Sequence, residues 1–172
     1  MQNVFDENYN PTIDDLHRKQ IMKGEQQALL EIRDTAGQEE FRNTLDRHLR
    51  ETKGIIIVFS IDSKKSLQRA KKLWNLSSET KETKKFPVIF VGNKSDLEEL
   101  RAVTEEDEKQ LNEEFGVPVI ESSAKTGKNI KRLFDQIINL IDQIDEEKKE
   151  EKKEEKTEEK EEKEKKKKCL IF

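Results

Sequence analysis

The sequence contains one cysteine, three prolines and six glycines among its 172 residues, and it has no long hydrophobic run. The single thiol, Cys169, excludes an intrachain disulfide and makes a reducing compartment the default. The longest apolar run, Ile55 to Phe59, is far too short to span a bilayer, and residues 1–7 lack the apolar core of a secretory signal. Residues 1–144 are mildly acidic without a basic face, so nucleic acid is not an expected partner.

The scarce glycines exclude one further motif. None of the six belongs to a G-x-x-x-x-G-K-[ST] segment, the loop that surrounds nucleotide phosphates with backbone N–H groups and a lysine. Gly127-Lys128 continues with Asn129 and does not complete the pattern. The sequence therefore contains no phosphate loop of this kind.

Charge, in contrast, is abundant and localised. Lys and Arg number 34 and Asp and Glu 38, so 42% of the residues are charged. From Asp145 to Lys168 every residue except Thr157 is Asp, Glu or Lys. The period-four repeat at 146–153 places like charges at i,i+4, so we expect a frayed or disordered tether there, and the missing apolar seam excludes a coiled coil. The sequence thus predicts one domain over 1–144 and a charged tether over 145–168.

The domain alternates apolar runs with helical patterns. Runs rich in Ile, Val and Phe without strict alternation are typical of strands buried on both faces, as in a parallel sheet. Four such runs occur, at 28–32, 54–61, 86–92 and 117–120. Alternation of strands and helices predicts an α/β fold with helices on both faces of the sheet.

Three helices are indicated by caps and periodicity. Asp62-Ser63 can cap a helix with Leu67, Ala70, Leu73 and Trp74 on one face. Residues 104–107, preceded by Val103, resemble a capping box with its hydrophobic staple. Apolar residues from Ile130 to Ile144 follow the i, i+3, i+4, i+7 rule of a last helix.

Three polar segments follow the predicted strands in a fixed order: Asp34–Glu40, Asn93–Asp96 and Ser122–Lys125. Each lies at the carboxyl end of a strand, where open α/β sheets bind ligands. In this order the segments resemble those of a Ras-like small GTPase, and the resemblance extends over residues 2–144 and the last four residues. It implies binding of GTP and GDP and hydrolysis of GTP.

The second and third segments would read guanine. The Asp96 carboxylate can accept from the N1–H and the 2-amino group together. By resemblance Asn93 would hold the loop and approach N7, the stems of Lys94 and Lys125 would cover the two faces of the base, and Ala124 would offer its N–H to the guanine oxygen. The full set that the resemblance assigns to nucleotide binding is Phe5, Thr12, Asp34, Gly37, Asn93, Lys94, Asp96, Ser123, Ala124 and Lys125. A capped turn of ordinary polar residues is the alternative interpretation.

The first segment would face the phosphates. The resemblance implies a Mg²⁺ cofactor held by Asp34 through water and by the Thr12 hydroxyl. Gly37 leaves room for a backbone N–H to reach the γ-phosphate, and Gln38 resembles the catalytic glutamine that orients the attacking water. Phe5 resembles the aromatic residue beside guanine, although it can also be a plain core residue.

The segment around Thr12 resembles the first switch and effector-binding edge of the Ras branch. The residues concerned are Tyr9, Pro11, Thr12, Ile13, Asp14 and Asp15. Asn10, Asp14 and His17 depart from the usual Asp, Glu and Tyr, so the resemblance implies effectors, exchange factors and GTPase-activating proteins without identifying them. His17 and His48 are most simply surface residues.

The last four residues, Cys169–Phe172, fit the C-a-a-X prenylation pattern, and a terminal Phe favours geranylgeranyl over farnesyl. A single chain anchors weakly, and Lys165–Lys168 can add attraction to an anionic surface. We therefore expect localisation at the cytoplasmic face of a membrane, with the plasma membrane as first choice.

The complete fold prediction is a P-loop NTPase-like, Ras-like mostly parallel sheet that lacks the family's first strand. That strand would lie centrally, between 28–32 and 55–61, so both neighbours are expected to have open edges. The main hypothesis is an N-terminally incomplete sequence of a membrane-tethered GTP-hydrolysing switch in signal transduction. The alternatives are a nucleotide-independent effector-binding module at a membrane and a misfolded product without function.

Overall fold

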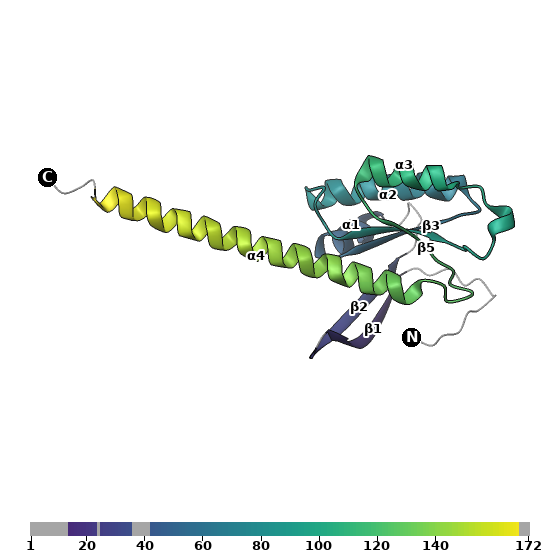
Figure 1. Cartoon of the computed structure of the whole chain (residues 1–172), viewed down its shortest axis with the longest axis horizontal. Helices are drawn as coiled ribbons and strands as arrows, with labels where there is room; N and C mark the ends of the chain where they lie inside the picture. Colours follow the sequence, from purple (N-terminus) through teal and green to yellow (C-terminus); the bar gives the residue numbers. More distant parts are fainter. Residues whose placement is uncertain (1–13, 24, 36–41, 169–172) are drawn as a thin grey trace.

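The computed structural model describes residues 14–23, 25–35 and 42–168. Figure 1 shows a layered α/β body from which one long helix projects. The elements in chain order are β1 (Asp14–Lys23), β2 (Gln26–Thr35), α1 (Arg42–Glu51), β3 (Ile55–Ser60), α2 (Lys64–Lys81), β4 (Val88–Asn93), η2 (Glu98–Leu100), α3 (Glu105–Phe115), β5 (Val119–Glu121) and α4 (Ile130–Lys168).

A parallel sheet of order β3-β4-β5 forms the centre of the body. Successive side chains of a strand point to opposite faces, so the apolar runs serve two cores. Ile57, Phe59 and Phe90 pack with residues of α2 and α3 on one face, whereas Ile89 and Val91 pack with α4 on the other. Figure 1 shows the same layers, with α2 and α3 above the sheet and α4 below it. Three of the predicted strands and the predicted α/β class are thereby confirmed.

The predicted helix starts are also confirmed, because each has a side chain that satisfies a free backbone N–H. Ser63 caps α2 and accepts from Ser66 N, while Leu67, Ala70 and Trp74 are buried on the face that the sequence indicated. Thr104 and Asp107 form the reciprocal capping box of α3. Val103, just before that cap, is fully buried.

The run at 28–32 differs from its prediction as a strand buried on both faces. It belongs to β2, which pairs antiparallel with β1 in a two-stranded hairpin from Asp14↔Thr35 to Lys23↔Gln26. None of the residues whose exposure is described in either strand is buried, and Leu29 is 60% exposed. Exposed and half-buried residues alternate from 27 to 33, and this period-two pattern suits a strand covered on one face at most. Neither β1 nor α1 is predicted by the sequence analysis.

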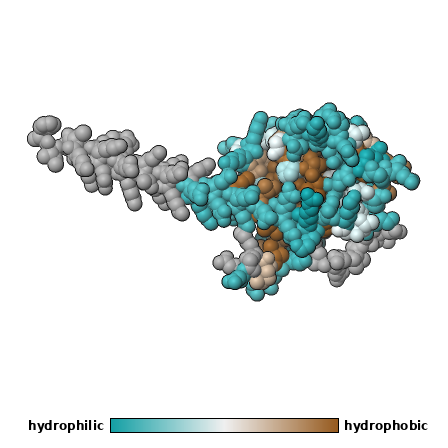
Figure 2. Space-filling model, viewed as in Figure 1, coloured by the Kyte–Doolittle hydropathy of each residue, from teal (hydrophilic) through white to brown (hydrophobic). Residues whose placement is uncertain are grey.

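The hairpin and the parallel sheet are separate. Among the described residues, no strand pairing joins β2 to β3, so both have an open edge. Val58 in β3 is 53% exposed although the strand is otherwise mostly covered. Figure 2 shows where hydrophobic residues reach the surface of the otherwise hydrophilic body. The separation agrees with the prediction that a strand central to the family's sheet is absent from this sequence.

The charged segment also differs from its prediction as a frayed tether. Helix α4 continues without a break from Ile130 to Lys168, and its last part extends beyond the body (Figure 1). Glu and Lys have good intrinsic helix propensity, and opposite charges at i,i+3 offset the like charges at i,i+4. Lys53 and Lys85 bind Asp145 and Glu147 at 2.7 and 2.8 Å and hold the base of this segment to the body.

Candidate functional site

Two predicted ligand-binding loops lie side by side at the carboxyl edge of the parallel sheet. They follow the adjacent strands β4 and β5, whose final pair is Gly92↔Glu121. Ser122 N donates to Gly92 O at 2.8 Å, and Ser95 N donates to Ser122 O at 2.9 Å. The sheet therefore continues as a short ladder between the loops, which fixes their separation.

The Asn93 side chain connects the two loops. Its Oδ1 accepts from Ala124 N at 3.1 Å. Lys94, the next residue, has a left-handed backbone with φ of 62°, and its carbonyl accepts from Leu97 N at 2.8 Å in a tight turn. Asn93 therefore links the two loops, and the Ala124 N–H predicted to meet guanine is paired with Asn93 in this structure.

Asp96 and Ser123 form the second connection. Ser123 Oγ donates to Asp96 Oδ1 at 2.5 Å and accepts from Thr126 N at 3.1 Å. This hydrogen bond, aided by the charges of Lys125 and Lys94, lowers the pKa of Asp96, so its carboxylate is ionised at neutral pH. Ser123 is fully buried, whereas Asp96 is exposed. The structure thus offers an oriented, accessible anion of the kind that a pair of N–H donors requires.

Asp62 is a neighbour of the site that the sequence analysis assigned only to helix capping. Ser63 makes the cap, and Asp62 instead accepts from Lys94 Nζ at 3.2 Å and from Ser60 Oγ at 2.5 Å. The Ser60 bond is the main cause that lowers the pKa of Asp62. Because Asp62 follows β3 at the same sheet edge, it can fix the direction of the Lys94 stem. Its position after a strand end is a signal that could have identified it.

The predicted metal ligand Asp34 and the effector-edge residues Asp14 and Asp15 lie on the hairpin. Asp15 and Asp34 face each other across the β1–β2 pair. Arg33 Nη1 lies 3.8 Å from Asp14 Oδ2 and 2.6 Å from His48 Nε2. The prediction that His48 is a surface residue is wrong, because it is only 6% exposed. It packs where α1 meets the hairpin and contacts an arginine, and an apolar periodicity cannot reveal such a partner.

The remaining predicted residues lie outside the described parts of the chain, so their roles stay predictions. They are Phe5, Tyr9, Pro11, Thr12, Ile13, Gly37, Gln38 and Cys169. Within the described ranges, no three His, Cys, Asp or Glu side chains gather as a metal site would require. An exposed carboxylate such as Asp34 is the oxygen donor that Mg²⁺ prefers, so this one ligand fits the expected ion. No helix in the part that the structure describes is long and apolar enough to cross a bilayer.

Polar loops at the carboxyl edge of a parallel sheet between two helical layers define an α/β ligand-binding protein. Comparison with known proteins gives the family. The model of the Ras family matches residues 1–143. The chain is 37% identical over 141 residues to Ras-like protein rasB of Dictyostelium discoideum, covering 82% of this chain and 72% of that one. It is 39% identical over 141 residues to protein ras-1 of Neurospora crassa, covering 82% and 66%. This chain belongs to the Ras family of small GTPases.

Proposed function

We propose that this protein is a guanine-nucleotide-dependent switch that hydrolyses GTP to GDP and acts in signal transduction at a membrane. The observation that carries the proposal is the connected pair of loops after β4 and β5. There, Ser123 Oγ donates to the carboxylate of Asp96, which is ionised and exposed. Membership of the Ras family supports the same activity.

The base would be held by residues whose geometry is described above. Asp96 would accept from the N1–H and 2-amino group of guanine, and the stems of Lys94 and Lys125 would cover its faces. The Ala124 N–H would exchange Asn93 for the guanine oxygen when the base enters. Adenine presents an acceptor at N1, so the Asp96 carboxylate would repel it. Binding of adenine would also leave polar groups of the site without partners, and this cost would favour guanine over adenine.

The phosphate end of the site would be formed by Thr12, Asp34, Gly37 and Gln38. Mg²⁺, when bound, would neutralise charge that develops on the phosphates. Asp34 and Thr12 would hold the ion, Gly37 would donate its N–H to the γ-phosphate, and Gln38 would orient the attacking water. We expect Gln38→Leu to lower single-turnover hydrolysis of GTP and to leave its binding largely intact.

The direct test of the base site is the affinity of a fluorescent guanine nucleotide for the full chain. Asp96→Ala removes a charge-assisted bidentate contact worth about 1.5–3 kcal/mol, so affinity should fall about tenfold to a hundredfold. Asp135→Ala, an exposed carboxylate on α4, is the matched control and should change nothing. Equal affinity in the Asp96 and Asp135 variants would contradict the assignment.

The membrane part of the proposal rests on the Cys169–Phe172 pattern and on Lys165–Lys168. Prenylation of Cys169 would anchor the chain, and the α4 helix would separate the body from the anchor. Cys169→Ser should release the protein from membranes on fractionation. If that variant stays in the membrane fraction, the anchor lies elsewhere.

A second function is favoured by the open edges of β2 and β3 among the described strands. We propose as an alternative a nucleotide-independent module that presents the edge from Tyr9 to Asp15 to an effector. Tight binding of guanine nucleotide to the purified chain would refute the alternative and support the switch.

A further inference from the structure

Glu108 in α3 is an acidic residue with an unusual environment. Its side chain is partly buried, and its Oε1 is fully buried without a hydrogen-bond partner among the described residues. Its helix neighbours Glu105 and Glu106 are exposed instead. An ionised carboxylate oxygen in such a place lacks both water and a donor, which is costly.

The buried oxygen lies against the backbone at the end of β4. A Cβ placed on Gly92 would be 3.0 Å from Glu108 Oε1, 3.2 Å from the Phe59 ring and 3.3 Å from Ile61. Phe59 and Ile61 are almost fully buried. The carboxyl group therefore lies so close to residue 92 that a side chain at that position would crowd Glu108 as well as Phe59 and Ile61.

The charged groups around Glu108 do not supply the missing donor. Glu121 in β5 lies within hydrogen-bond reach and repels it, as does Glu105 on its own helix, while Arg101 attracts it. Arg101 is already engaged, because it binds Glu121 at 2.6 Å and Glu98 at 2.7 Å. Burial, followed by the charge of Glu121, raises the pKa of Glu108 from its ordinary value of 4.5 to about 7.

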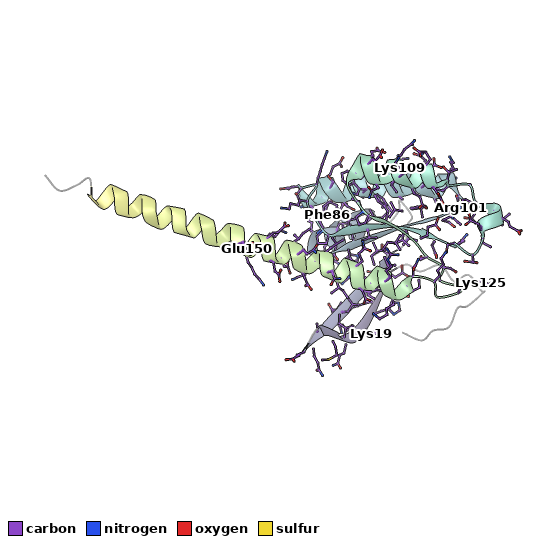
Figure 3. The ribbon with its side chains drawn as sticks, viewed as in Figure 1. Lys19, Phe86, Arg101, Lys109, Lys125 and Glu150 are labelled. Atoms are coloured by element: carbon purple, nitrogen blue, oxygen red, sulfur yellow. The ribbon has the colours of Figure 1, made fainter. Side chains whose placement is uncertain are left out.

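The Glu108 carboxyl group lies directly behind the base loops. Gly92 and Glu121 are the last pair of the β4–β5 ladder, and Ser122 N donates to Gly92 O immediately beyond it. The next residues after this pair on the two strands are Asn93 and Ser122, which begin the loops that contain Asp96 and Ser123. Figure 3 shows Arg101 and Lys125 at the same end of the body, opposite Phe86.

We propose that Glu108 is a proton-linked positioning residue for the guanine loops. Protonated, its carboxyl donates to the Glu121 carboxylate and holds the Gly92–Glu121 pair closed. Ionised, it has released that proton to solvent and repels Glu121, which strains the pair and the loops beyond it. The inference rests on the proposed base site and adds a pH response to it: affinity for guanine nucleotide falls as pH rises through neutrality.

The raised pKa of Glu108 also makes the stability of the fold depend on pH. Because the pKa of Glu108 is higher in the folded chain than in the unfolded chain, the folded state holds a proton that the unfolded state has released between about pH 4.5 and pH 7. Stability therefore falls as pH rises through this window, and the full cost is present above pH 7. Glu108→Gln removes the charge at nearly constant shape and should be most stabilising at high pH.

The first experiment measures the thermal midpoint of the full chain from pH 5 to pH 8. Glu108→Gln should gain about 2–6 °C relative to wild type at pH 8 and little at pH 5. Glu106→Gln, an exposed carboxylate on the same helix, should follow wild type at every pH. Glu108→Ala, which also lacks the charge, should flatten the pH dependence even if its absolute midpoint falls. An unchanged pH dependence in both Glu108 variants would overturn the proposal.

The second experiment measures binding of a fluorescent guanine nucleotide at pH 6 and pH 8. Wild type should bind about threefold to tenfold more weakly at pH 8, which corresponds to a coupling of half to one pKa unit. Glu108→Gln should lose this difference. If no variant binds nucleotide at either pH, the proposed function fails while the thermal series still tests the protonation of Glu108. A thermal effect without any effect on binding would overturn the positioning role.

Discussion

The two sheets use apolar strands in different ways. In β4 the first five of six residues are buried, because α2 and α3 cover one face and α4 covers the other. In β2 exposed and half-buried residues alternate from 27 to 33, no residue of described exposure is buried, and the only hydrogen-bonded neighbour among the described strands is β1. A strand's apolar content therefore indicates what it can bury, whereas its neighbours decide how much it does bury.

The same difference separates the two halves of the predicted site. The base loops are held by hydrogen bonds between their own residues and by the sheet edge from which they leave. Asp14 and Asp34 lie on the hairpin, and one contact between the hairpin and α1 is the approach of Arg33 to His48. The base half is built into the core, and the hairpin half depends more on local polar contacts.

The largest expected effect is a core truncation in the parallel sheet. Phe90 is fully buried and its ring centroid lies 5.8 Å from that of Phe115, so Phe90→Ala should cost about 3–5 kcal/mol in urea unfolding. Leu29→Ala in the hairpin should change stability by about 0.5 kcal/mol or less, since Leu29 is exposed. Similar losses for the two variants would show that the sheets do not differ as described.

A smaller effect is expected where the base loops are joined. Ser123→Ala removes a donor to Asp96 and leaves Thr126 N without its acceptor, which should cost about 1–3 kcal/mol of unfolding free energy. Ser95→Ala is the control in the neighbouring loop. Its hydroxyl is also buried but has no hydrogen-bond partner among the described residues, so its removal should be neutral or stabilising. Chemical denaturation of both variants measures the difference, and equal losses would contradict it.

The hairpin contact should be weaker. His48→Phe keeps an aromatic ring but removes the acceptor for Arg33 Nη1, so it should cost about 0.5–1.5 kcal/mol. Hydrogen exchange should quicken in β1 and β2 and stay unchanged in β4. In a double-mutant cycle, Arg33→Leu should cost much less stability in the His48→Phe background than in wild type, because the contact is already lost. Simple additivity of the two substitutions would show that this contact does not hold the hairpin.

The smallest effect concerns the cap of α3, which covers the parallel sheet. Hydrogen bonds from the Thr104 backbone, Lys64 and the Thr104 hydroxyl lower the pKa of Asp107 from 3.8 to about 2. The contribution of the ionised Asp107 carboxylate to the free energy of unfolding is therefore fully present above about pH 4 and is lost as pH falls through about 2. Asp107→Asn should cost about 1 kcal/mol at pH 7 and clearly less at pH 2, where Asp107 is partly protonated in the folded chain, measured by unfolding at each pH. A loss at pH 2 as large as the loss at pH 7 would assign the effect to the shape of the side chain.

Local signals predicted much of the body. Ser63 and Thr104 were recognisable as caps because their partners lie three residues away. The order of the base loops followed from strands that end at one edge of a parallel sheet. β1 was not predicted because its residues are largely polar, although β2 follows it directly in the chain. The environment of His48 was not predictable because its partner Arg33 lies 15 residues away and on another element.

The sequence by itself determined the α/β class, the helix caps and the residue types of the base loops, since each depends on neighbours within a few residues or on a fixed spacing. Only the tertiary structure decided that β2 pairs antiparallel with β1, that Asp62 contacts Lys94, and that Glu108 lies between Gly92 and Glu121. The physical reason is that burial and electrostatic environment arise from residues brought together across the fold, and these set the cost of an open edge and the pKa of a carboxyl group.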